Sequence, residues 1–310
     1  MFDSAGLKRP PDYGDFVAHI REFYRDFGRA MPWRETRDPY AIFVSEIMLQ
    51  QTQVPRVMEK YPPFLERFPD FETLAAARLG DIYALWQGLG YNRRAKFLHQ
   101  AAQRIVGEHQ GRVPESRAEL EALPGVGPNT AGSLLAFCHN RALPFIETNI
   151  RRVFIYFFFP DAEEVHDRDL LPLVEATLDR ENPREWYWAL MDYGTMLKSW
   201  VTNPNRRSRQ YVRQSPFENS NRQIRGRILR VLHQAISASP GSGAAGAGDA
   251  VAEVPRGGGT AGSDRERRGA LGPEELARRV GYPEDRVRAA LEGLQREGMV
   301  VAGEEGYSLP

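Results

Sequence analysis

The eight residues Leu123-Pro-Gly-Val-Gly-Pro-Asn-Thr130 constrain the fold of this chain more than any other segment. The residues on both sides have helical spacing, so the segment predicts two helices joined by a two-glycine hairpin. Gly125 and Gly127 can adopt positive φ angles, and the missing side chains let another backbone approach closely. The hairpin amides and the N-terminus of the second helix, near Asn129, then point at one spot that suits a phosphate. The pattern favours a contact with a DNA backbone, although an ordinary helical corner has the same signature.

Helical periodicity dominates the chain from Asp15 to about Arg213. Strand-like alternation is almost absent before residue 290, so we predict an all-α fold of many moderate-length helices. We expect helix breaks at the prolines at 32, 39, 62, 63, 69, 114 and 124, and a new helix at Pro55. The apolar-periodic stretches are 16–27, 41–58, 74–86, 94–106, 118–122, 129–139 and 149–158.

The composition limits the class of protein. A chain of 310 residues is long enough for two domains and a third small one, and 42% of the residues are hydrophobic. The 41 basic and 41 acidic residues cancel, so any contact with nucleic acid must come from local patches. The single cysteine, Cys138, excludes internal disulfides and cysteine metal sites, and its apolar helix face predicts a core position.

Neither a signal peptide nor a membrane-spanning segment is recognisable in the sequence. Residues 1–14 are polar and contain prolines. The longest fully apolar run, Val153 to Phe159, has seven residues and is too short to cross a bilayer. We expect a cytoplasmic, nucleoid-associated protein.

The composition changes near the C-terminus. Residues 237–270 are rich in glycine, alanine and serine, which predicts a flexible linker because such a stretch buries little apolar surface. The pattern around it resembles a winged-helix module, residues 219–310, interrupted by this linker. Residues 285–296 of this module are a candidate for binding duplex DNA, and binding of a protein partner is the alternative. The flanking elements are helical patterns at 221–234, 273–280 and 283–296 and hairpin segments at 299–301 and 306–309.

Candidate chemistry lies upstream of the hairpin, in Ser45-Glu-Ile-Met-Leu-Gln-Gln-Thr-Gln-Val54. A helix here places Glu46 beside apolar residues, where partial burial raises the pKa of a carboxyl and allows proton donation near neutral pH. An exposed helix carboxylate is the alternative. The glutamines at 50, 51 and 53 form either a solvated face or a group that can fill a gap in a base stack.

Four segments, in order, resemble the helix–hairpin–helix (HhH-GPD) DNA glycosylase superfamily, most of all its adenine glycosylase (MutY-type) branch. They are MPWRETRDPYAIFVSEIMLQQTQV, LWQGLGYNRRAKFLHQAA, LPGVGPNTAG and ALMDYGTM, and the resemblance covers about residues 15–200. It implies a two-lobed all-α fold with a DNA-binding cleft between the lobes. Residues 30–145 are expected to form a six-helix lobe, and residues 1–29 with 146–215 a second helical lobe.

The resemblance implies an enzyme of base excision repair that flips a nucleotide out of the duplex and hydrolyses its N-glycosidic bond. Glu46 matches the family's proton donor, which also helps to activate water. Gln50 and Gln51 match residues that wedge into the duplex, and Tyr91 matches an aromatic wedge. The expected DNA contacts of the hairpin are Gly125, Val126, Gly127, Asn129 and Thr130.

The family's second carboxylate is an aspartate, and this chain has Glu147 at that position. Such an anion stabilises the positive charge that builds on the sugar as the glycosidic bond breaks. Glutamate is one methylene longer, and a misplacement of ~1 Å can cost about 100-fold in rate. Glu147 is therefore a working substitute, a sign of a pocket rebuilt for another base, or a sign of an inactive DNA-binding protein.

Two further departures concern the mechanism and the cofactor. Strand-cleaving relatives use a lysine two residues after the last hairpin glycine, and Asn129 at this position predicts a monofunctional glycosylase because an amide forms no Schiff base. Relatives commonly bind an iron–sulfur cluster through four cysteines, and the matching residues are Lys198, Asn205, Ser208 and Gln214. We therefore expect no cluster, metal or other cofactor. The lobe is expected to close by packing of Trp186, Trp188, Tyr193, Met196 and Trp200.

A basic run lies where the cluster loop would be, and it includes Arg206, Arg207 and Arg209. Beside a DNA cleft we expect these arginines to contact phosphates, and a purely solvated face is the alternative. The family's domain for sensing oxidised guanine has no counterpart here, and Asn92 replaces the second tyrosine of GLGYY. Mispaired adenine is the expected substrate in double-stranded DNA. A thymine/uracil mismatch glycosylase and a non-catalytic DNA-binding regulator are the alternatives.

Overall fold

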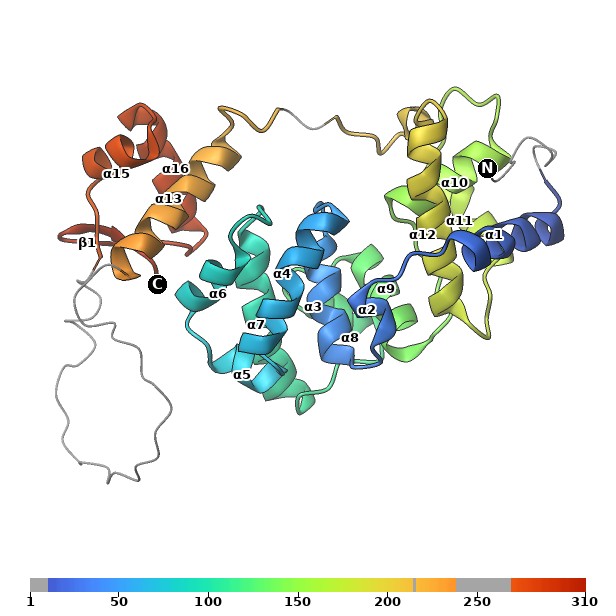
Figure 1. Ribbon diagram of the computed structural model, residues 1–310, viewed down its shortest axis with the longest axis horizontal. Coiled ribbons are helices and arrows are strands. Elements are labelled where there is room, and N and C mark those ends of the chain that lie inside the picture. Colours follow the sequence, from blue (N-terminus) through green and yellow to red (C-terminus); the bar gives the residue numbers. More distant parts are fainter. Residues whose placement is uncertain (1–10, 214–215, 238–268) are drawn as a thin grey trace. The chain divides into compact units, whose positions relative to one another are not determined.

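The structure is a computed structural model, and it describes residues 11–213, 216–237 and 269–310. The predicted linker at 237–270 lies almost entirely outside the described residues. Within them the secondary structure is helical, apart from one two-stranded sheet and two isolated bridges (Figure 1). The all-α prediction is therefore confirmed. None of the described helices is long and apolar enough to cross a membrane.

Twelve α-helices and one 3-10 turn precede residue 213. The predicted six-helix lobe at 30–145 holds eight helices, α2 to α9, because the short α2 was not predicted and the predicted stretch 74–86 covers two helices, α5 and α6. The elements are α1 (Tyr13–Phe27), α2 (Pro32–Glu35), α3 (Pro39–Leu49), α4 (Val54–Arg67), α5 (Phe71–Ala76), α6 (Leu79–Trp86), α7 (Arg93–His109), α8 (Arg117–Ala122), α9 (Pro128–His139), α10 (Thr148–Phe158), α11 (Asp167–Ala176), α12 (Pro183–Trp200) and η1 (Pro204–Arg207).

The prediction of a helix break at Pro62 and Pro63 is wrong, because both prolines lie inside α4. A proline in a helix removes the amide that would bond to the carbonyl four residues earlier, here at Met58 and Glu59. Both residues are exposed, so water can satisfy their carbonyls. The opposite face of α4 is buried, and this packing keeps the helix continuous.

The described chain divides into two compact units. Unit 1 comprises the described residues within 1–75 and 100–214, and unit 2 comprises those within 76–99 and 215–310. This division differs from the three predicted domains, because residues 76–99 group with the C-terminal residues. The sequence pattern around residue 76 gives no sign of this grouping.

The core of unit 1 is rich in aromatic residues. The ring of Phe16 on α1 lies 5.3 Å from Phe154 of α10 and 6.1 Å from Trp186 of α12, centroid to centroid. Trp186, Trp188 and Tyr193 are buried as predicted, whereas Trp200 is 45% exposed at the end of α12 and contributes little to the core. Cys138 is buried, also as predicted, and burial raises the pKa of its thiol.

Unit 2 contains the arrangement predicted for a winged-helix-like module. Its C-terminal elements are α13 (Asn221–Ser237), α15 (Pro273–Val280), α16 (Glu284–Arg296), β1 (Val301–Gly303) and β2 (Gly306–Ser308). The three helices pack pairwise, and β1 pairs antiparallel with β2. Leu271 bridges to Tyr307 on the other side of β2, where a winged helix has its third strand. α13 also packs against α6 within this unit.

Candidate active site

Glu46 lies near the C-terminal end of α3, a helix that is buried on most sides. The carboxylate of Asp38 accepts hydrogen bonds from the amides of Tyr40 and Ala41 and so caps the N-terminus of this helix. The neighbours Ser45 and Ile47 are fully buried. The Glu46 side chain is half-buried, so its carboxyl lies in a poorly hydrated environment, as the apolar sequence pattern predicted.

The surroundings of Glu46 keep part of its carboxyl protonated near neutral pH. Burial raises its pKa to about 7, and the negative charge of Glu147 acts in the same direction. The hydroxyl of Ser133 on α9 donates a hydrogen bond of 2.6 Å to Oε2 of Glu46 and partly opposes the shift. A carboxyl with this pKa can both give and accept a proton at physiological pH.

Glu147 lies near enough for its negative charge to raise the pKa of Glu46. It is the N-cap residue of α10, and its Oε1 accepts hydrogen bonds from the amides of Asn149 (2.7 Å) and Ile150 (2.9 Å). Burial raises the pKa of Glu147, while these amides and the nearby Arg152 and Arg151 lower it. The Glu147 carboxylate thus caps its own helix, and unit 1 contains two half-buried carboxyls with different surroundings.

A buried arginine behind Glu147 was not found by sequence reasoning. Arg152 is 4% exposed and donates to Oδ1 of Asn149 (2.7 Å), to Oδ1 of Asn203 (3.2 Å) and to the carbonyl of Gly194. Nδ2 of Asn149 in turn lies 3.3 Å from Oε2 of Glu147. A Cβ atom at Gly194 would clash with the Asn149 carbonyl, so α12 and α10 approach closely. This network holds the first turn of α10, and with it Glu147, in place.

The predicted hairpin connects α8 to α9. Gly125 has a φ of +81°, as expected, whereas Gly127 has a φ of −94° and is the N-cap of α9. No side chain accepts a hydrogen bond from the first-turn amides of α9 as a cap. The space beside Gly127 is open, since a Cβ atom there would meet nothing within 4 Å. Val126 is buried, and Asn129 and Thr130 lie in the first turn of α9.

Gln50 ties this hairpin to the end of α3. Its Nε2 donates to the carbonyl of Gly125 (3.0 Å) and to the hydroxyl of Thr130 (3.1 Å). Because Glu46 is one helical turn earlier, the proton donor and the hairpin are fixed relative to each other. In this structure Gln50 therefore supports the hairpin, which differs from the wedge role that the resemblance implies.

The other two predicted wedge residues share a backbone conformation that the sequence did not reveal. Gln51, in unit 1, has a φ of +53°, and Tyr91, in unit 2, has a φ of +47°. Both side chains are exposed. Non-glycine residues rarely adopt positive φ, and such strain is concentrated at functional sites.

The three predicted phosphate-binding arginines have different surroundings. Arg207 is half-buried and donates hydrogen bonds to the carbonyls of Phe159, Pro160 and Ala162, just after α10. Its guanidinium therefore satisfies carbonyls at the end of this helix, which differs from the predicted phosphate contact. Arg209 pairs with Glu164 at 3.2 Å, and Arg206 is exposed.

The residues at the cluster positions do not fit an iron–sulfur cluster. Asn205 is buried and donates to the Thr148 carbonyl (2.8 Å), and Ser208 is buried, donates to Oε1 of Gln210 (3.1 Å) and bridges to Val165. Lys198 is exposed, and Gln214 lies outside the described residues. None of these side chains is a thiolate, and the described residues contain no group of three or more His, Cys, Asp or Glu residues suited to a metal ion.

Comparisons with known proteins identify the family of this chain. Residues 44–172 match the family described as HhH-GPD superfamily base excision DNA repair protein. Over 250 residues the chain is 33% identical to the adenine DNA glycosylase of Mycobacterium tuberculosis, covering 70% of this chain and 78% of that protein. It is 36% identical over 184 residues to the adenine DNA glycosylase of Buchnera aphidicola subsp. Baizongia pistaciae, covering 59% of this chain and 52% of that protein. The chain thus spans about half the length of this second relative.

The fold also has a solved counterpart. The structure of a thermostable thymine-DNA glycosylase is similar with a TM-score of 0.53 and 26% identity, covering 59% of this chain and 86% of that one. The helical fold and the two-glycine hairpin between α8 and α9, which Gln50 ties to the helix of Glu46, agree with the class of helix–hairpin–helix DNA repair proteins. The chain belongs to the HhH-GPD superfamily of base excision DNA repair proteins.

Proposed function

We propose that the chain is a monofunctional DNA glycosylase that hydrolyses the N-glycosidic bond of mispaired adenine in double-stranded DNA. The observation that carries the proposal is Glu46, whose half-buried carboxyl has its pKa raised to about 7 by burial and by the negative charge of Glu147. The names of the relatives in Mycobacterium and Buchnera support adenine as the base. DNA is the expected partner, and a DNA substrate implies a cytoplasmic, nucleoid-associated protein.

The reaction follows from the two carboxyls. The protonated Glu46 gives its proton to a ring nitrogen of the flipped purine, and the electron pair of the breaking C1′–N bond passes to the base. The carboxylate of Glu147 stabilises the positive charge that develops on the sugar. The Glu46 carboxylate then accepts a proton from the water whose oxygen bonds to C1′. The products are free adenine and an abasic site, and Glu46 regains its proton.

The structure also supports different roles for the residues expected to contact DNA. The hairpin around Gly125 and Gly127 presents the uncapped first turn of α9 to a phosphate, and Asn129 and Thr130 lie in that turn. Gln51 and Arg206 are exposed and suit contacts to the duplex. Asn129 at the position of the strand-cleaving lysine supports hydrolysis without strand cleavage.

A panel of mismatched and damaged duplexes, scored by mass spectrometry for released base and by gel for nicked strands, tests the proposal. We expect release of adenine without strand cleavage before alkali treatment. Glu46→Gln should abolish release while its affinity for the duplex stays within about twofold, because the amide cannot donate the proton. No release by the wild type from any duplex would leave the DNA-binding regulator as the better hypothesis.

One observation favours a second candidate base. The similar solved structure is a thymine-DNA glycosylase, and Asn92 replaces the family's second tyrosine. Release of thymine or uracil opposite guanine in the same panel, with adenine retained, would make this chain a thymine/uracil mismatch glycosylase that uses the same two carboxyls.

A further inference from the structure

An aromatic residue in unit 2 is held in a strained and exposed position. Tyr91 follows Gly88 (φ +96°) and Gly90 (φ +75°), and it has a φ of +47° itself. Nε1 of Trp86 donates to the Gly90 carbonyl at 3.2 Å, and the guanidinium of Arg94 donates to the same oxygen at 3.0 Å. These bonds fix the loop, while the Tyr91 ring is 37% exposed at its tip. The loop thus presents an aromatic side chain at a conformational cost, which is typical of a functional position.

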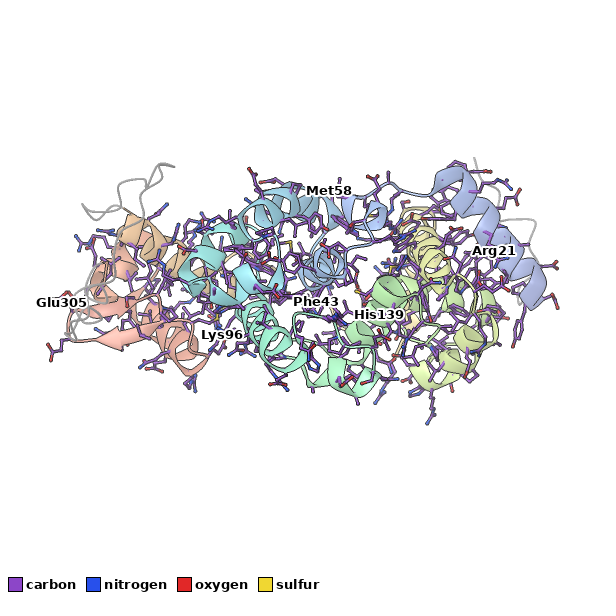
Figure 2. The ribbon with its side chains drawn as sticks, turned by 90° about the horizontal axis from the view of Figure 1, so that it is seen from below. Arg21, Phe43, Met58, Lys96, His139 and Glu305 are labelled. Carbon is purple, nitrogen blue, oxygen red and sulfur yellow. The ribbon has the colours of Figure 1, made fainter. Side chains whose placement is uncertain are left out.

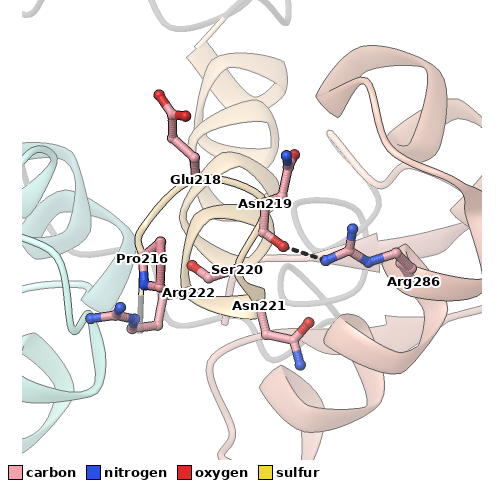
Figure 3. A pocket seen from close by; sticks show the side chains of 7 residues that line it. All are labelled: Pro216, Glu218, Asn219, Ser220, Asn221, Arg222 and Arg286. Carbon is pink, nitrogen blue, oxygen red and sulfur yellow. Dashed lines mark hydrogen bonds between the residues drawn. The ribbon is translucent and has the colours of Figure 1, made fainter. Parts of the chain in front are cut away.

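Two guanidinium groups contact this ring. That of Arg94 lies 5.8 Å from the ring centroid and comes from the adjacent helix, α7. That of Arg222 lies 5.7 Å from the centroid, and its NH1 donates a hydrogen bond of 2.8 Å to the Tyr91 hydroxyl. Arg222 is in the first turn of α13 and so comes from the C-terminal module (Figure 3). The cation–π contacts and the hydrogen bond to the hydroxyl both restrict how the Tyr91 ring can rotate.

An ionic cluster holds the C-terminal module against α7, close to Tyr91. The carboxylate of Glu297, after α16, accepts hydrogen bonds from Arg93 of α7 and Arg225 of α13. Nζ of Lys96 donates to the backbone carbonyls of Glu297 and Gly298 (Lys96 is labelled in Figure 2). The cluster joins α7, α13 and the end of α16, and it places the first turn of α13, with Arg222, beside Tyr91.

The distribution of charge on the C-terminal module favours α13 as the element that binds a polyanion such as a DNA backbone. α13 carries four arginines and no acidic residue among residues 221–237. The usual reading helix of a winged-helix module, α16, has a mixed surface, since Arg288 pairs with Glu284 and Asp285 and Glu292 are exposed. The hairpin tip carries the exposed Glu304 and Glu305 (Glu305 is labelled in Figure 2), which a phosphate backbone repels.

We propose that Arg222 of the C-terminal module is a positioning residue for Tyr91, and that the module takes part in DNA contact through the first turn of α13 rather than through α16. The guanidinium holds the ring in the orientation in which it can insert beside a base step, and it remains next to the backbone phosphates there. The inference rests on the proposed action on duplex DNA. It assigns the C-terminal module a part in opening the duplex.

The test compares Arg222→Ala, Arg222→Lys and Tyr91→Phe with Arg288→Ala, which removes the same charge from α16. Each full-length variant is measured for affinity to a mismatched duplex, for single-turnover release of base, and for the fluorescence of 2-aminopurine placed next to the mismatch. We expect Arg222→Ala to slow release by about tenfold and to weaken the fluorescence change, with an unaltered Tm. Arg222→Lys should recover part of both, and Arg288→Ala should behave as the wild type.

A double-mutant cycle separates positioning from simple charge loss. If Arg222 acts through the Tyr91 hydroxyl, Arg222→Ala should cost less in a Tyr91→Phe background. Equal effects of Arg222→Ala and Arg288→Ala, or a loss of affinity and rate only in Arg288→Ala, would overturn the proposal. The fluorescence and affinity readouts need no turnover, so they decide the role of Arg222 even if the wild type releases no base.

Discussion

At the level of single residues, the chemistry depends on how unlike the surroundings of two carboxyls are. Glu46 has one hydroxyl donor, Ser133, and its pKa is raised to about 7. Glu147 has two backbone amide donors and two nearby arginines, which oppose the effect of burial. The raised pKa of Glu46 suits a proton donor, and the amides and arginines near Glu147 favour its carboxylate form, which suits an anion. Differences of this kind assign acid and anion roles in many hydrolases.

Glu46 should make the stability of the fold depend on pH. Its pKa is raised on folding from 4.5 to about 7, so the unfolded chain loses this proton first as pH rises. The native state then loses about 1–3 kcal/mol of stability between pH 4.5 and pH 7, and no more above that. We expect Glu46→Gln to match the wild type near pH 4.5 and to be more stable by this margin at pH 8, measured by urea unfolding.

Ser133 provides the matched control for this prediction. Ser133→Ala removes the hydrogen bond that favours the ionised carboxylate, so the loss of stability should extend to higher pH than in the wild type. Identical pH profiles of the wild type and Glu46→Gln would show that the carboxyl titrates normally, and the role of Glu46 as a proton donor would lose its physical basis.

The sequence pointed to these two carboxyls because both lie in segments that resemble the motifs of the family, in the same order along the chain. It could not predict Arg152, because an arginine on an amphipathic helix gives no sign of whether it is buried. Nor could it predict that Gln50 bonds to Gly125, 75 positions away, since this depends on how α3 and the hairpin pack. Motifs locate the reacting groups, whereas the residues that hold them are defined by tertiary contacts.

At the level of elements, α10 connects the site to the loop that follows α12. Glu147 caps its N-terminus, and Arg207 satisfies carbonyls at its C-terminal end. Hydrogen bonds from Asn205 and Ser208 fix the same loop. At two of the four positions where the resemblance implies cluster ligands, Asn205 and Ser208, this chain thus has buried polar contacts.

Arg207→Ala should therefore destabilise unit 1 without any involvement of metal. Removing the guanidinium leaves several half-buried carbonyls without a donor, which costs about 2–4 kcal/mol. Arg209→Ala, which removes an exposed arginine paired with Glu164, should have little effect on Tm. Treatment with a chelator should leave the Tm of every variant unchanged, and elemental analysis should find no iron. Iron in the purified protein, or a fall in Tm on chelation, would contradict this account.

Element boundaries show where propensity fails. The sequence located most helices of unit 1, since apolar periodicity depends on which face is buried, but none of the predicted stretches covers α2, α11 or α12. It misplaced a break at Pro62, because a proline on the solvent side of α4 leaves only carbonyls that water can satisfy. It also gave Gly127 a positive φ, although an N-cap position has an extended backbone.

At the level of the whole molecule, the grouping of residues 76–99 with the C-terminal module was the largest departure from the sequence-based prediction. It depends on contacts between residues far apart in the chain, such as Tyr91 with Arg222 and Lys96 with Glu297. Local patterns carry no information on such pairs. The order of helices and hairpin in this part of the chain nevertheless follows its local sequence signals, and its assignment as a winged-helix module stays a prediction.

Glu297 should control whether the module stays packed on α6 and α7 within unit 2. Hydrogen bonds from Arg225 and Arg93 lower its pKa to about 2, so its contribution to stability is complete above pH 4.5 and is lost only as pH falls towards 2. Glu297→Gln leaves the half-buried Arg225 without its counter-ion, which costs about 1–3 kcal/mol. We expect faster hydrogen exchange in α6 and α13 of this variant at pH 7, with exchange in α3 and α9 unchanged. Glu275→Gln, which removes a carboxylate that pairs only with Arg278 and Arg279 on its own helix, should exchange like the wild type. Equal exchange in both variants would mean that apolar packing alone holds the module, and Arg222 would then stay beside Tyr91 without the cluster.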